Sequence, residues 1–157
     1  MKKVLLTLTL CSILAAACKK HYPLAPQGQP SILGEWRVTS ISTYNYDATG
    51  LRDSSLYSYS GPNSDKYTFD FNNDHSWTEL FSVSPQDPLH VAANGIYSIT
   101  SDTSFTLMYP SASITRMNEP CKIQSLTNVL FIFSKQLPTV FNGTDPGYIK
   151  YVFRLSR

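Results

Sequence analysis

Acidic and amide side chains gather in one short segment, where residues 70–74 read Asp-Phe-Asn-Asn-Asp. Their spacing matches the first three ligand positions of a calcium-binding loop. Such a loop needs Gly at its sixth position and a bidentate Glu at its twelfth, but this sequence has His75 and Phe81 there. The same residue types are typical of a tight turn between two strands. We therefore interpret the segment as a hairpin turn and predict no calcium site.

Histidine and cysteine are the other candidate metal ligands. His75 and His90 would meet only if folding brought them together, and no further Cys or His stands at the spacing of a metal site. We expect both histidines to lie on the surface. The sequence therefore predicts neither a metal nor a cofactor.

Motifs of common enzyme classes are missing from the chain. There is no Gly-x-Ser-x-Gly elbow, His-Glu-x-x-His, phosphate-binding loop or dinucleotide fingerprint. Glutamate occurs only as Glu35, Glu79 and Glu119, so we expect no carboxylate pair on an inner strand face for glycoside chemistry. We predict no catalytic residue and a protein that is not an enzyme, with a hydrolase as the least favoured alternative.

Cys18 is the residue for which the sequence predicts covalent chemistry. It follows Lys2 and Lys3, an apolar run over residues 4–14 and three alanines, which is the form of an export signal. The run is too short for a lasting anchor, because spanning a bilayer takes about 20 helical residues. Leu14-Ala15-Ala16-Ala17-Cys18 resembles a bacterial lipobox. The resemblance implies cleavage before Cys18 and acylation of its thiol with chains such as palmitate; an ordinary signal that happens to precede a Cys is the alternative.

The chain divides into three predicted segments. Residues 1–17 form the lipoprotein signal peptide, and residues 18–31 form the lipidated Cys with a tether rich in proline and without apolar periodicity. Residues 32–157 form a single domain. Cys11 leaves with the signal, so Cys121 has no disulfide partner and is expected to be a small buried hydrophobe.

Apolar and polar residues alternate with period two from residue 32 onward, in short runs separated by Gly, Pro, Asn, Asp and Ser. In the first run we expect Trp36, Val38 and Ser40 on one face and Ile41 on the other. We predict an all-β fold, an antiparallel up-and-down barrel of eight or nine strands, with a β-sandwich as the alternative. The candidate strands cover residues 36–41, 67–71, 77–83, 94–100, 104–108, 122–126, 129–134 and 148–155, with weaker candidates at 56–60 and 89–93.

Two segments at opposite ends of this domain resemble a known family. Leu33-Gly34-Glu35-Trp36 and Phe153-Arg154-Leu155 are similar to the Gly-x-Trp and late-Arg pair of the lipocalin superfamily. Residues 32–157 resemble the lipocalin-like lipoproteins of Gram-negative, Bacteroidota-type bacteria. The resemblance implies a barrel closed at one end by Gly34 and Trp36. It also implies that Arg154 lies across the Trp36 ring as a cation-π partner.

Aromatic residues are abundant, with 10 Tyr, 8 Phe and 2 Trp making up 13% of the chain. Rings on the inner strand faces either line a ligand cavity or fill the barrel, and we favour filling because an eight-stranded barrel is narrow. The rings concerned are Tyr67, Phe69, Trp77, Tyr97 and Phe131. A second group in a Ser-rich stretch is the predicted exposed patch for a partner protein or glycan; it consists of Tyr44, Tyr46, Tyr57 and Tyr59.

Composition narrows the expected function. Removing Lys2 and Lys3 leaves equal numbers of basic and acidic residues, which argues against a nucleic-acid partner. We expect a monomeric, lipid-anchored, non-catalytic lipoprotein of the cell envelope that binds a small apolar ligand or an envelope protein. An accessory subunit with a filled barrel is the alternative. Lys19 and Lys20 after the Cys favour the outer membrane and its periplasmic face over the cell surface.

Overall fold

The computed structural model describes residues 30–60, 66–82, 88–110, 118–141 and 145–157. The predicted signal peptide, Cys18 and most of the tether lie outside these residues, as does Val83 of the predicted 77–83 strand. Within the described residues every regular element is a strand, and no helix has the length and apolarity that crossing a membrane requires. The strands are β1 (Gly34–Asp47), β2 (Gly50–Ser58), β3 (Tyr67–Phe71), β4 (Ser76–Phe81), β5 (His90–Ser101), β6 (Ser104–Met108), β7 (Glu119–Leu126), β8 (Leu130–Phe141) and β9 (Asp145–Ser156).

A single antiparallel sheet contains all nine of these strands, in the order β2-β1-β3-β4-β5-β6-β7-β8-β9. β1 also pairs with β9, which closes eight strands into a barrel and leaves β2 as an extra strand on its edge. The prediction of an all-β up-and-down barrel is therefore confirmed, and the sandwich alternative is wrong because one closed sheet forms the core. Closure satisfies the backbone groups that an open edge would expose.

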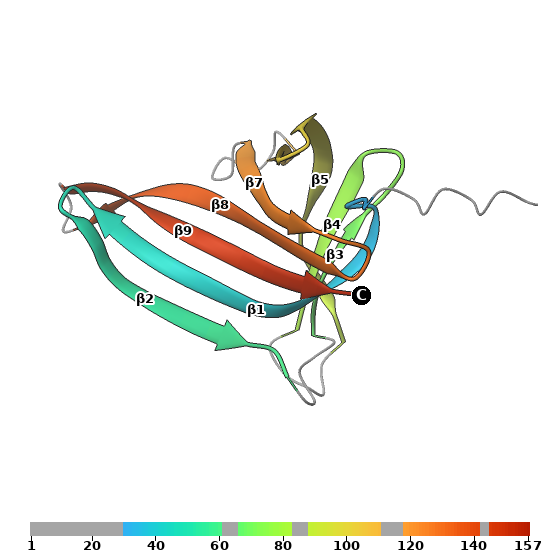
Figure 1. The fold of residues 1–157 in the computed structure, drawn as a ribbon, viewed down its shortest axis with the longest axis horizontal. Coiled ribbons are helices and arrows are strands. Elements are labelled where there is room, and N and C mark those ends of the chain that lie inside the picture. Colours follow the sequence, from blue (N-terminus) through green and yellow to red (C-terminus); the bar gives the residue numbers. More distant parts are fainter. Residues whose placement is uncertain (1–29, 61–65, 83–87, 111–117, 142–144) are drawn as a thin grey trace, which may run out of the picture.

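β1 serves two parts of the molecule (Figure 1). Its residues 34–37 pair with β3 inside the barrel, whereas residues 40–47 pair with β2 on one side and β9 on the other. The long strands β8 and β9 stay paired up to Phe141 and Asp145. Residues 41–47, Gly50–Ser58, 136–141 and 145–151 thus form a four-stranded sheet extension beyond the barrel, which projects to the left in Figure 1.

A β-bulge in β1 changes which side chains face inward. The register with β9 shifts between Val38 and Ser40, so that Ile41 pairs with the buried Phe153. Ile41 packs against the core, and Ser40 turns to the other face opposite Arg154. The predicted faces of this strand are therefore right for Trp36 and Val38 and wrong for Ser40 and Ile41, because an extra residue reverses the alternation.

The predicted 67–71 and 77–81 hairpin is present as β3 and β4, with Phe71 opposite Trp77. Asp74 closes its turn, since the carboxylate accepts hydrogen bonds from the Ser76 amide at 2.9 Å and hydroxyl at 2.6 Å. These bonds also hold the pKa of Asp74 below its usual value. His75 takes a positive φ of 66° at the tip. The segment with calcium-loop spacing is thus a turn.

Aromatic rings fill the core of the barrel. Phe69 contacts Phe133 and Phe153 at centroid distances of 5.6 and 5.5 Å, and Phe133 stacks on Phe153 at 4.9 Å. Gly95 allows β5 to approach β6 closely, because a Cβ there would lie 2.0 Å from the Met108 carbonyl oxygen. The fully buried side chains of this core are Trp36, Trp77, Phe69, Phe71, Phe105, Phe131, Phe133, Leu107, Leu155 and Val38.

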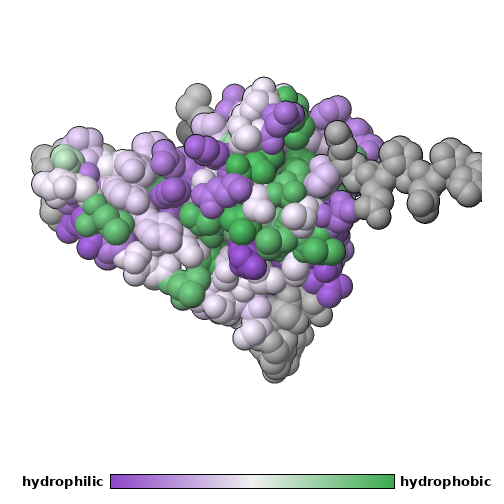
Figure 2. Space-filling model, viewed as in Figure 1, coloured by the Kyte–Doolittle hydropathy of each residue, from purple (hydrophilic) through white to green (hydrophobic). Residues whose placement is uncertain are grey.

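The surface of the extension differs from that core. Figure 2 shows mainly hydrophilic and neutral side chains over the extension, and apolar side chains gathered nearer the centre of the view. Every residue of β2 except Gly50 is exposed. The extension is therefore held by backbone pairing more than by burial.

Candidate functional site

The Trp36 end of the barrel is closed by a three-part contact. The Trp36 indole N–H donates to the Ile32 carbonyl at 2.7 Å, and the ring also packs on Phe131. The Arg157 guanidinium lies 3.8 Å from the centroid of the Trp36 ring and donates to the carbonyl oxygen of Leu33. Gly34 takes a φ of +96° here, a value that suits glycine.

Arg157, rather than the predicted Arg154, is the cation-π partner of Trp36. Arg154 lies between the inward-facing Phe153 and Leu155, so the alternation of β9 turns its side chain to solvent. Its backbone carbonyl accepts a hydrogen bond from the Thr39 hydroxyl at 3.0 Å. The predicted cation-π contact with Trp36 is therefore present, but Arg157 makes it instead of Arg154.

The five rings predicted to line or fill the barrel are all buried, but they lie at different levels. Phe69, Trp77 and Phe131 are at most 1% exposed and packed among other rings, so they fill space that a ligand would need. Tyr97 lies at the Trp36 end, where its hydroxyl donates to the Asn72 carbonyl at 2.9 Å. Tyr67 lies at the opposite end and is the only one of the five that faces the pocket described below.

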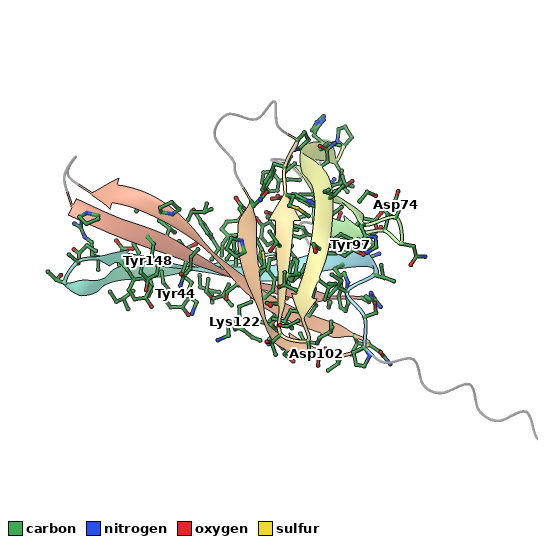
Figure 3. The ribbon with its side chains drawn as sticks, turned by 90° about the horizontal axis from the view of Figure 1, so that it is seen from above. Tyr44, Asp74, Tyr97, Asp102, Lys122 and Tyr148 are labelled. Carbon is green, nitrogen blue, oxygen red and sulfur yellow. The ribbon has the colours of Figure 1, made fainter. Side chains whose placement is uncertain are left out.

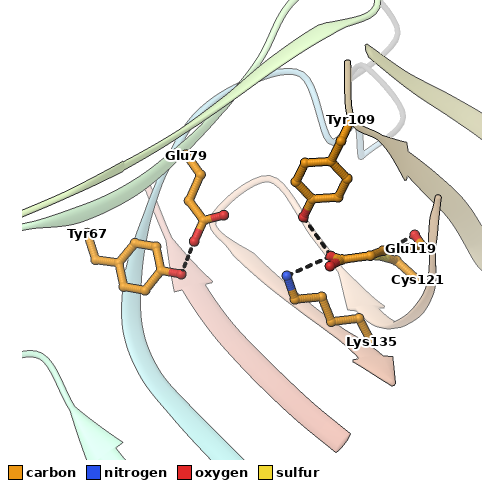
Figure 4. A network of polar contacts seen from close by, with 6 residues as sticks. All are labelled: Tyr67, Glu79, Tyr109, Glu119, Cys121 and Lys135. Carbon is orange, nitrogen blue, oxygen red and sulfur yellow. Dashed lines mark hydrogen bonds and ion pairs between the residues drawn. The ribbon is translucent and has the colours of Figure 1, made fainter. Parts of the chain in front are cut away.

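Above the aromatic core, polar side chains cross the barrel interior (Figure 4). We call this set the polar layer: Tyr67, Glu79, Tyr109, Glu119 and Lys135. The Tyr67 hydroxyl donates to Glu79 Oε1. Glu119 Oε2 accepts from the Tyr109 hydroxyl at 2.7 Å and from Lys135 Nζ at 2.8 Å. Glu79 and Glu119 are only 7% and 4% exposed, so two carboxylates lie inside the barrel, where we expected no carboxylate pair for glycoside chemistry.

The sequence contained a signal for these residues. Glu79 stands two residues from both Trp77 and Phe81, and Lys135 stands two residues after Phe133, so each has the inward parity of its strand. Charged residues are usually exposed, which is why parity alone did not identify them.

Charge in the polar layer is unevenly compensated. Lys135 and Glu119 form a buried ion pair, whereas the interaction of Glu79 inside the barrel is the hydrogen bond from Tyr67. Glu79 Oε2 is buried and has no hydrogen-bond partner among the described residues. Burial first, and then the neighbouring Glu79 carboxylate, raise the pKa of Tyr67, so Tyr67 stays a protonated donor.

A pocket of about 290 Å³ opens above the polar layer, where the barrel meets the extension. It is lined by Glu79, Tyr67 and Lys135 of the polar layer, and its other lining residues, which we call its walls, are apolar or aromatic except for Thr43. The wall residues are Ile41, Thr43, Tyr57, Leu137, Tyr151 and Phe153. A concave apolar surface with a few converging polar groups is the usual form of a small-molecule site, although this volume is at the lower end of the range.

Two larger depressions lie elsewhere on the described part of the chain. One of about 610 Å³ borders the Trp36 end and includes Ile32, His75 and Tyr97, and one of about 590 Å³ includes Lys122, Gln136 and Lys150. The buried polar atoms without a hydrogen-bond partner in the described residues are Trp77 Nε1 and Glu79 Oε2, and of these two residues only Glu79 lines a depression. Of these three depressions, the smallest is therefore the one lined by a residue with an unpartnered buried polar atom.

The four predicted patch tyrosines do not form one surface. Tyr46 stacks on Tyr148 at 4.6 Å on the outer face of the extension, where Figure 3 shows Tyr44 close to Tyr148. Tyr57 lies on the inner face, contacts Tyr59 at 4.7 Å and lines the pocket. The β1 and β2 alternation separates the pairs, so the prediction of a single patch is wrong.

The described residues include no group of three or more His, Cys, Asp and Glu side chains able to hold a metal ion. His75 and His90 are both exposed, and His75 packs near the Tyr97 ring at 5.5 Å. Comparison with known proteins adds no assignment: no protein-family model and no curated protein matches the chain. The site must therefore be interpreted from its own geometry.

Proposed function

We propose that this protein is a lipid-anchored, non-catalytic binding protein of the bacterial outer membrane, with a lipocalin-like barrel that takes up a small molecule. The observation that carries the proposal is the 290 Å³ pocket lined by Glu79, a residue whose carboxylate keeps one buried oxygen without a hydrogen-bond partner among the described residues. Unpaired buried polar atoms are costly and rare, so such an atom in a pocket favours a ligand that pairs with it.

The neighbouring groups favour binding over catalysis. Glu119 already accepts hydrogen bonds from Lys135 and Tyr109, so its charge is compensated and its orientation is fixed within the barrel. Burial raises the pKa of the Cys121 thiol to about 12, which disfavours the nucleophilic thiolate at neutral pH. A binding function uses the pocket without requiring a reactive group.

The lipid anchor rests on Cys18 and its lipobox-like segment. Described residues begin at the Trp36 end of the barrel. The pocket is lined by residues of the extension such as Thr43, Tyr57 and Leu137, and Figure 1 shows the extension on the other side of the molecule from the start of β1. A tether from an acylated Cys18 would thus enter the domain at the closed end and leave the pocket facing away from the membrane. Outer-membrane residence on the periplasmic side follows from Lys19 and Lys20, and removal of the domain by protease treatment of whole cells would contradict it.

Ligand uptake is tested with a neutral fluorescent probe, 2-naphthol, on protein lacking residues 1–18, which keeps every residue of the closed barrel. We expect saturable binding at one site. Thr43→Trp fills the pocket and should weaken binding at least about tenfold. Ser42→Trp adds the same side chain on the outer face of the same strand and should leave binding unchanged.

The alternative of an accessory subunit with a filled barrel makes the opposite prediction. Absence of saturable 2-naphthol binding, or equal binding by the Thr43→Trp and Ser42→Trp variants, would contradict the proposed function. Mass spectrometry of the protein purified from membranes tests the anchor separately, because acylation of Cys18 adds the mass of its lipid.

A further inference from the structure

We propose that the ligand of this pocket is a small organic amine, whose ammonium group binds Glu79 while its apolar body lies against the aromatic walls. The inference rests on the proposed function, because it assigns the ligand class of the same pocket. It follows from two features of the polar layer, an open hydrogen-bond acceptor and an unequal charge balance, and from the aromatic side chains that line the pocket.

The open acceptor is Glu79 Oε2, which is buried and unpartnered, whereas Oε1 receives the Tyr67 hydroxyl. A carboxylate oxygen only accepts hydrogen bonds, so the missing partner must be a donor. Tyr67 cannot serve both oxygens with its single hydroxyl proton. Within the part of the chain that the structure describes, the geometry therefore leaves one acceptor position open to a donor.

Charge balance indicates that this donor is cationic. Lys135 lies 2.8 Å from Glu119 Oε2, so these two charges compensate each other, and no ion pair joins Glu79 to another described residue. A buried charge is costly unless it is paired. An anionic ligand would meet the Glu79 carboxylate, whereas Lys135 is already engaged by Glu119. A cation on Glu79 makes a charge-assisted hydrogen bond, which is stronger than a neutral one.

The walls of the pocket suit a cation attached to an apolar body. Tyr57, Tyr67, Tyr151 and Phe153 all line it, and aromatic faces attract ammonium groups. One such contact already exists within the protein, because Lys135 Nζ lies 5.5 Å from the centroid of the Phe153 ring. Ile41 and Leu137 add aliphatic surface for the body of the ligand.

The test compares three ligands that share a phenyl body: 2-phenylethylamine, 2-phenylethanol and 3-phenylpropanoate. Displacement of 2-naphthol at pH 7 gives the affinity of each. In the wild-type protein we expect the amine to bind at least about tenfold more tightly than the alcohol, the gain typical of a hydrogen bond to a charged group. The carboxylate should bind more weakly than either.

Glu79→Gln is the matched variant, because the amide keeps the shape and removes the charge. It should lose the preference for the amine, so that 2-phenylethylamine binds no more tightly than 2-phenylethanol. Glu35→Gln is the control, since Glu35 is exposed and ion-paired with Arg37 at 3.7 Å outside the barrel. That variant should retain the full amine preference.

The outcomes separate the two proposals. Binding of 2-naphthol without amine preference in the wild-type protein overturns the amine assignment and leaves the pocket intact as a binding site. Amine preference that persists in Glu79→Gln also overturns it. Failure of every probe, 2-naphthol included, contradicts the proposed function itself. The wild-type comparison requires no variant, so it decides the assignment even if Glu79→Gln does not fold.

Discussion

Arg157 combines a cation-π contact with hydrogen bonds at the closed end of the barrel. Its guanidinium covers the Trp36 ring and donates to the carbonyls of Leu33 and, at 3.3 Å, Ser31. Arg157→Ala should lower the free energy of unfolding by about 1 to 2 kcal/mol, from the lost ring contact and the lost donors. Chemical denaturation measures the change.

Arg154→Ala is the matched control for this prediction. Arg154 is exposed, so its replacement should change stability by less than about 0.5 kcal/mol. Equal losses in the two variants would show that the Arg157 contact with Trp36 does not stabilise the closed end.

Cys121 links stability to alkaline pH. Burial raises its thiol pKa from 9.0 to about 12, with the Glu119 carboxylate adding and Lys135 opposing. Between these values the unfolded thiol has released its proton and the folded thiol has kept it, so the free energy of unfolding should fall as pH rises from about 9 to 12. Tyr59, whose pKa burial raises to about 12, acts in the same direction.

Urea denaturation at a series of pH values checks this dependence. Cys121→Ala removes the thiol and should give a shallower fall above pH 9, with the remaining slope due to the tyrosines. A Cys121→Ala profile parallel to the wild type would contradict the assignment.

β2 is the edge strand of the sheet, and its side chains are exposed to solvent. It pairs only with β1, and its side chains from Leu51 to Ser58 are exposed. Strands with little buried surface open locally at low free energy. In hydrogen exchange read by mass spectrometry, peptides covering Gly50–Ser58 should therefore exchange well before those covering Asp145–Ser156. Strand β9 has two partner strands. Equal hydrogen-exchange rates in β2 and β9 would therefore contradict the prediction that β2 opens more readily.

Sequence alternation predicted most of this sheet, and its failures have physical causes. The run at 104–108 coincides with β6, because Phe105 and Leu107 alternate with polar residues between turns. The weak candidate at 56–60 covers only the last three residues of β2, since the Ser-rich sequence of this strand lacks an apolar face and its pairing to β1 is a tertiary effect. β8 and β9 run beyond their predicted ends for the same reason: pairing with each other continues them into the extension.

The candidate site was less predictable than the fold. Tyr67 was foreseen from its strand parity, but the pocket also depends on Ile41, which the β1 bulge turns inward, and on Glu79. A bulge leaves no clear signature in a single sequence. Whether an inward charged residue finds a partner depends on the register between paired strands, as Glu119 on β7 and Lys135 on β8 illustrate.

The barrel as a whole is layered along its axis: a sealed aromatic core, the polar layer, and then the pocket. The ion pair of Lys135 and Glu119 is buried, so removing one partner leaves an isolated charge. Lys135→Met should lower the free energy of unfolding by about 3 to 5 kcal/mol. Glu119→Leu combined with Lys135→Met should recover most of this loss, because a packed apolar pair replaces a buried ion pair at little cost.

Thermal and urea denaturation of the wild type, the single and the double variant complete the cycle. Lys122→Met, an exposed lysine on β7, should be close to neutral. A double variant no more stable than Lys135→Met would show that the polar layer contributes more than charge compensation.

The fluorescence of the two tryptophans reports on the closed end of the barrel and on the region beside the polar layer. Trp36 lies under Arg157, and Trp77 contacts Tyr109 at 5.2 Å beside the polar layer, with each indole at most 1% exposed. Native emission should accordingly be blue-shifted and move to longer wavelength when the chain unfolds. Trp36→Phe would leave Trp77 as the single tryptophan, beside the polar layer, so that occupancy could be followed from its emission on excitation at a wavelength that tyrosine does not absorb.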